Sequence, residues 1–60
     1  MIYFAVVVDG IVISFVTEES QKGALIDSYD NIEFYEFDWD KEEPPMIPDF
    51  YVEDGQLKQV

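Results

Sequence analysis

The chain has 60 residues, of which 48% are hydrophobic and 17% aromatic, a composition that indicates one small folded domain and not a disordered acidic tail. Its formal net charge is −11, from fourteen acidic residues against three lysines, so direct binding to nucleic acid or to an anionic membrane surface is not expected. The chain contains no cysteine and no histidine, which excludes disulfide bonds, thiolate metal sites and the usual near-neutral general base.

The most apolar stretch of the chain, MIYFAVVVDGIVISFV, predicts a β-hairpin. Its β-branched and aromatic residues favour strands at residues 2–8 and 11–16, and Asp9-Gly10 fits a two-residue turn that needs positive φ angles. A membrane-spanning helix would need about 20 continuous apolar residues, and Asp9-Gly10 interrupts the run before that length. A secretory signal is not expected, because no positive charge precedes Ile2.

A short helix is predicted at residues 18–28. Thr17 is a suitable N-cap residue, and the two acids that follow it favour the positive end of the helix dipole. Gly23 weakens this helix by about 1 kcal/mol relative to alanine. The pair Asp30-Asn31 is expected to end the helix and turn the chain.

A third strand is predicted at residues 32–39, although its apolar and polar side chains alternate imperfectly. The apolar side chains change face halfway along the strand, after Phe34. A bulge near Tyr35-Glu36 would bring all of them inward. The alternative is a strand that has apolar surface on both sides.

The composition changes from residue 40 onward, where all three prolines of the chain occur. Pro44, Pro45 and Pro48 favour an extended arm, since proline fixes φ and cannot donate a backbone hydrogen bond. The last segment, residues 51–60, predicts a second small hairpin whose turn lies in the sequence EDGQ.

The predicted fold class is therefore α+β, with residues 1–39 as a small antiparallel core of order β-β-α-β and residues 40–60 as a Pro-rich extended arm and C-terminal β-hairpin. Strict alternation along the second strand places Phe15 on the face opposite Val12. Both faces of the opening hairpin are apolar, and one short helix can cover only one of them. The second face predicts association with another copy or a larger protein, unless the C-terminal arm folds back over it.

The side chains expected to contact a partner lie on the opening hairpin and along the arm. They are Tyr3, Val7, Val12, Met46, Ile47, Phe50 and Tyr51. Three other aromatic residues, Phe34, Phe37 and Trp39, are expected to belong to the core.

No catalytic residue, cofactor or metal ion is predicted. The spacing of Asp38, Asp40 and Glu42 is like the start of a calcium-binding loop, but Glu43 stands where that loop needs glycine and Asp49 where it has a bidentate glutamate. The serines have no histidine partner, and no Gly-rich phosphate loop exists. A chain of this length can hardly enclose a substrate pocket as well as a core, so the protein is not expected to be an enzyme.

Two segments of the chain, IYFAVVVDGIVISFV and PPMIPDFYVEDGQLKQV, resemble short accessory proteins of tailed bacteriophages and the closing segments of phage tail and fibre-associated chains. The resemblance implies a structural protein of the virion or tail that works by assembly, located in the virion or the host cytoplasm. It implies no functional residue, because that group has no catalytic signature.

The sequence therefore predicts non-enzymatic protein–protein association, as a small phage structural or assembly protein. The expected partner is a second copy or a larger structural protein, and a basic protein would be attracted by the charge. The alternative is an acidic inhibitor that mimics nucleic acid and blocks a basic host protein.

Overall fold

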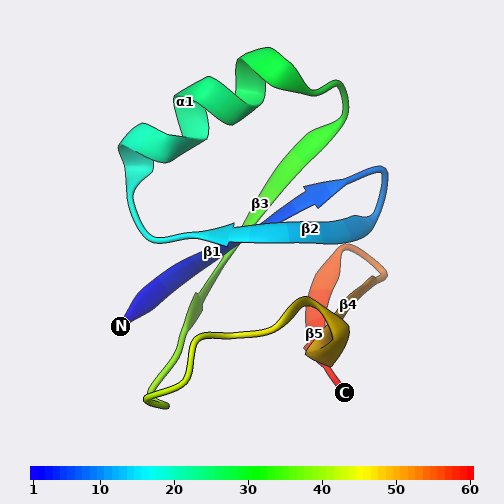
Figure 1. Cartoon of the computed structure of the whole chain (residues 1–60). Coiled ribbons are helices and arrows are strands. Elements are labelled where there is room, and N and C mark those ends of the chain that lie inside the picture. The colour runs from blue at the N-terminus through cyan, green and yellow to red at the C-terminus, as the bar shows by residue number, and fades with distance from the viewer.

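The computed structural model describes all 60 residues and contains five strands, one α-helix and one short 3-10 helix (Figure 1). In chain order the elements are β1 (Ile2–Val8), β2 (Ile11–Val16), α1 (Glu19–Ser28), β3 (Ile32–Asp38), η1 (Ile47–Asp49), β4 (Phe50–Glu53) and β5 (Gln56–Gln59). The first three strands form an antiparallel sheet of order β2-β1-β3, and β4 pairs with β5. The α+β class and the strand–strand–helix–strand order are thus confirmed.

Both hairpins reverse at an Asp-Gly pair in which the two residues have positive φ. The angles are 53° and 80° at Asp9 and Gly10, and 53° and 73° at Asp54 and Gly55. Two positive angles are typical of the turn type that matches the right-handed twist of a hairpin, and glycine adopts them without steric cost. The two turns predicted from the sequence are confirmed.

The sheet contains a bulge in β2 and none in β3. The β1–β2 register shifts between Val6 and Val7, which leaves Ile13 as the extra residue. After the shift Phe15 pairs with Ala5 and lies on the same face as Val12, so the placement by strict alternation was wrong. The register of β3 with β1 is continuous, so β3 has apolar side chains on both faces.

Helix α1 lies against one face of the sheet, as Figure 1 shows. Its N-cap residue is Glu18 and not Thr17, and Gln21 Oε1 accepts from the backbone N–H of Glu18 at 3.2 Å. No helix residue is buried. The Nζ atom of Lys22 lies 3.7 Å from the ring centroid of Phe4, so a lysine covers part of the sheet beneath the helix.

The other face of the sheet is covered by the C-terminal hairpin, which lies on the side opposite α1 (Figure 1). Phe50 joins Ala5, Val7 and Val12 in one buried cluster, with Val52, Leu57 and several aromatic rings packed against it. The C-terminal segment therefore folds back over the second face of the opening hairpin, so a partner is not needed to cover that face. Residues 1–39 and 40–60 are distinct segments of the chain, but they share one core.

Candidate docking groove

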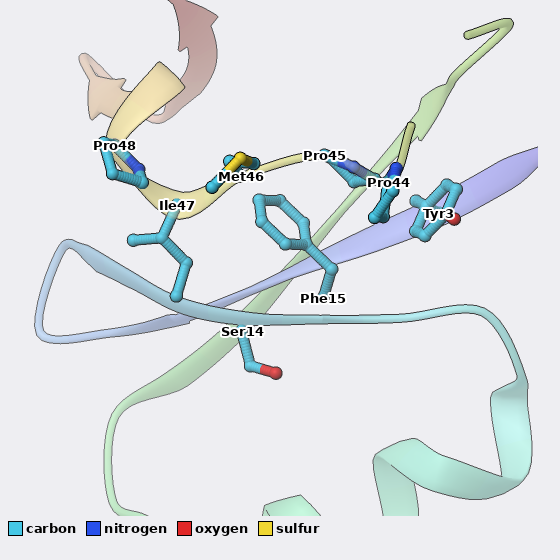
Figure 2. A pocket seen from close by; sticks show the side chains of 8 residues that line it. All are labelled: Tyr3, Ser14, Phe15, Pro44, Pro45, Met46, Ile47 and Pro48. Carbon is cyan, nitrogen blue, oxygen red and sulfur yellow. The ribbon is translucent and has the colours of Figure 1, made fainter. Parts of the chain in front are cut away.

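An open apolar groove of about 530 Å³ lies between the Pro-rich segment and the sheet (Figure 2). Its lining consists of Tyr3, Ser14, Phe15, Pro44, Pro45, Met46, Ile47 and Pro48. We call it the arm groove. Figure 2 shows the Phe15 ring pointing from β2 toward the arm, while the Ser14 side chain points away from it. Aromatic, proline and aliphatic surface therefore dominates the lining.

The arm is held in place at both ends by hydrogen bonds. At its start, the indole Nε1 of Trp39 donates to the carbonyl oxygen of Glu43 at 2.6 Å. At its end, the backbone N–H of Asp49 donates to the carbonyl oxygen of Met46 at 3.0 Å. The backbone N–H of Val60 donates to the backbone carbonyl oxygen of Asp49 at 2.8 Å. Prolines between these points restrict the backbone further, so the groove is largely preformed.

An aromatic cluster supports the sheet side of the groove. Phe37 and Phe50 are its centre, with ring centroids 5.2 Å apart, and Phe15 contacts Phe50 at 5.3 Å. Tyr3 stacks on Phe37 at 6.0 Å. Two of the groove-lining rings are thus fixed by packing with the core, and separations of this size are typical of favourable aromatic pairs. Of the three aromatic residues expected in the core, Phe37 and Trp39 pack against the buried cluster, whereas Phe34 is half-buried outside it, with its ring centroid 5.3 Å from Lys22 Nζ.

Three of the seven side chains expected to contact a partner line this groove. Tyr3 is half-buried in its wall, and Met46 and Ile47 are 61% and 43% exposed. Tyr51 is 43% exposed on β4 but does not line the groove. The structure brings Tyr3, Met46 and Ile47 together although they are far apart in the sequence.

Val7, Val12 and Phe50 require a correction. They are 1%, 5% and 8% exposed and pack against one another inside the chain, so their side chains are not available to a partner in this structure. The prediction for Val7 and Val12 rests on an uncovered face of the opening hairpin, and the prediction for Phe50 rests on its position beside the Pro-rich arm. The C-terminal hairpin covers that face, and Phe50 itself supplies part of the cover.

Phe15 and the prolines of the groove are not among the residues that the sequence predicts at the interface. Phe15 was assigned to the opposite face because nothing in IVISFV marks the position of the bulge. Pro45 is buried although it lies in a polar, Pro-rich segment. A usable signal was present in the repeated proline of PPMIP, since rigid apolar rings next to Met46 favour a preformed surface.

Acidic residues are exposed throughout the protein and flank the groove-lining segment in the sequence. All fourteen carboxylate side chains belong to exposed residues, and Glu42, Glu43 and Asp49 flank the groove-lining segment in sequence. Lys22 lies over Phe4, and Lys41 Nζ lies 4.9 Å from the ring centroid of Trp39. Two of the three lysines are therefore held over aromatic rings, which leaves most carboxylates without a cation of the same chain.

The titratable groups give little sign of catalytic tuning. Tyr35 is the one group with a clearly displaced pKa, which a hydrogen bond to Glu33 raises with help from desolvation and the charge of that carboxylate. No group of three or more acidic side chains is arranged to hold a metal ion, so Asp38, Asp40 and Glu42 do not converge on one site. The chemistry that the arm groove offers is burial of apolar side chains.

Comparisons with protein-family models, with characterised proteins and with solved structures return no match. No helix of the protein has the length and apolar character that crossing a membrane requires.

Proposed function

We propose that this protein works by binding another protein and that the arm groove receives apolar side chains of its partner. The observation that carries the proposal is the exposure of Met46 and Ile47 beside a preformed apolar groove, on a protein whose fourteen acidic residues are all exposed. Exposed apolar surface bordered by polar residues is typical of protein interaction sites. The groove supplies contact area, and the carboxylates around it select the partner.

The charge of the protein defines the chemistry of that partner. A net charge of −11 on a chain of 60 residues favours a protein with a basic surface around exposed apolar side chains. Electrostatic attraction of this kind mainly accelerates association and rejects acidic competitors.

Assembly of a bacteriophage tail or virion is the setting that we propose. Its support is the resemblance of IYFAVVVDGIVISFV and PPMIPDFYVEDGQLKQV to segments of phage accessory proteins. A small accessory chain of this kind acts by contact with a larger structural protein and needs no catalytic group.

The test is an affinity capture from an extract of the organism or virus that carries the gene, with bound proteins identified by mass spectrometry. Ile47→Thr removes apolar surface from the groove, and the matched control Ile26→Thr makes the same change on α1, where Ile26 is 53% exposed. We expect the wild type and the control to retain a basic protein that the Ile47→Thr variant loses. Equal capture by all three proteins would contradict the proposal.

A second candidate function is inhibition of a basic, nucleic-acid-binding protein by mimicry of its ligand. The observation that favours it is the exposure of all fourteen acidic residues. Mimicry predicts that binding weakens steeply as salt rises and that Ile47→Thr has little effect, because charge and not apolar contact would dominate. Groove binding predicts instead that Ile47→Thr weakens binding more than a rise in salt does.

A further inference from the structure

β2 forms a free edge of the three-stranded sheet. The order β2-β1-β3 leaves one side of β2 without a hydrogen-bonded strand, and the backbone hydrogen bonds outside the helices and strands do not involve residues 11–16. Figure 1 shows β2 crossing in front of β1 and β3, with α1 on one side and the C-terminal hairpin on the other. The outward N–H and C=O groups of β2 can therefore pair with another strand.

β2 is also the one edge strand that carries no charged side chain. β3, at the opposite edge, has the acids Glu33, Glu36 and Asp38. In the small sheet, β4 ends in Glu53 and β5 carries Lys58. Charged side chains on an edge oppose the addition of a further strand, so β2 is the edge at which addition is most favourable.

The position of the bulge makes one half of β2 the better pairing surface. Ile13 interrupts the regular ladder, and the stretch after it, residues 14–16, borders the arm groove through Ser14 and Phe15. Alternate side chains of a strand paired there would point to the groove side of the sheet, beside Met46 and Ile47. Backbone pairing would supply affinity and the groove would supply side-chain selectivity.

We propose that β2 receives an extended segment of a basic partner as an additional strand. The inference rests on the proposed function and names the partner segment: alternating apolar residues flanked by lysine or arginine. Charge complementarity supports this choice, because Asp9 lies just before β2 and Glu18 and Glu19 lie just after it. A second copy of this chain is a poorer occupant, since two molecules of charge −11 repel each other.

The test uses the full chain, labelled with ¹⁵N, and a synthetic peptide of alternating valine and threonine with two lysines at each end. We expect the peptide to slow hydrogen exchange at amide groups of β2 and to leave those of β3 unchanged. The same peptide N-methylated through its centre keeps its side chains and charges but cannot donate backbone hydrogen bonds, and it should bind roughly tenfold more weakly or worse. A peptide with glutamates in place of the lysines should not bind.

The outcomes separate this inference from the proposed function. Equal binding of the N-methylated peptide, or unchanged exchange in β2, would overturn strand addition. If Ile47→Thr still abolished capture of the natural partner, the groove function would stand. Loss of both the peptide effect and the sensitivity to Ile47→Thr would overturn both. Protection of β2 that rises with protein concentration alone would identify a second copy as the occupant and reject the basic segment.

Discussion

Tyr35 donates its phenolic hydrogen to Glu33 Oε2 across 2.7 Å, and this bond is the main cause of its raised pKa. The ordinary value is 10.0. Because the folded pKa is the higher one, the bond stabilises the fold fully below the unfolded pKa and is lost as pH rises through the folded pKa. We expect the contribution of Tyr35 to disappear only in strongly alkaline solution.

An ultraviolet titration of tyrosinate tests this expectation, with Tyr35→Phe as the reference that isolates Tyr35 from the other tyrosines. Glu33→Gln should lower the pKa of Tyr35, since it removes the carboxylate charge and weakens the acceptor. A pKa of Tyr35 that is unchanged in the Glu33→Gln variant would show that this pair does not hold the hydroxyl.

Lys22 stabilises the helix side of the sheet through its contact with aromatic rings. Its side chain is 20% exposed and lies over Phe4, and its Nζ atom is also 5.3 Å from the ring centroid of Phe34. Lys22→Met keeps the alkyl contact and removes the charge, so it should lower the free energy of unfolding by about 0.5–1 kcal/mol. Lys22→Ala should lower the free energy of unfolding further, because the packing of the lysine alkyl chain on the rings is also lost. Urea denaturation measures both, and a Lys22→Met variant as stable as the wild type would leave no role for the charge.

At the scale of the elements, the three glycines differ in what a methyl group would do. A Cβ atom would meet nothing within 4 Å at any of them, so the backbone conformation alone determines how an alanine at that position changes the stability. Gly23→Ala in α1 should stabilise the protein by about 0.5–1 kcal/mol, because alanine favours the helix. Gly10→Ala, at φ +80°, should destabilise it by about 1 kcal/mol. Thermal unfolding measures the melting temperature of both variants. If the two substitutions changed the melting temperature in the same direction, the backbone conformation would not be what distinguishes the two glycines.

The turns and the order of the elements could be predicted because their signals are local. Asp-Gly between two β-branched runs specifies a hairpin without reference to the rest of the chain. The bulge at Ile13 could not be predicted, because every neighbour except Ser14 is apolar and no polar residue marks the face. That single extra residue moved Phe15 to the other side of the sheet.

The candidate site was predicted in part for a related reason. Met46 and Ile47 were identified because they are apolar in a segment whose prolines keep them out of a ladder. Val7 and Val12 were misassigned, because their burial depends on Phe50, which is far away in the sequence. Local patterns identify surfaces that must be covered, but they do not specify which distant segment covers them.

At the scale of the whole molecule, the protein has one buried cluster to which both ends of the chain contribute. Phe50, the first residue of β4, packs its ring against the first sheet, where it contacts Phe15 of β2, Phe37 of β3 and Trp39 just after β3. A domain of 60 residues has a total stability of roughly 3–9 kcal/mol. Truncation of a buried phenylalanine lowers the free energy of unfolding by about 3–5 kcal/mol. The packing of Phe50 between the two sheets is therefore comparable in free energy with the stability of the entire fold.

Phe50→Ala should consequently unfold the whole chain, since removal of a buried phenylalanine costs about 3–5 kcal/mol. The matched control is Tyr51→Ala, which truncates the adjacent, 43% exposed ring and should leave the fold intact. Amide resonances of the labelled protein report on each sheet separately, and we expect those of β1 and β5 to collapse together in the Phe50→Ala variant. If the β2-β1-β3 sheet kept its dispersed resonances while only β4 and β5 lost theirs, the two segments would be independent units, and the shared core would not be what holds the arm groove in place.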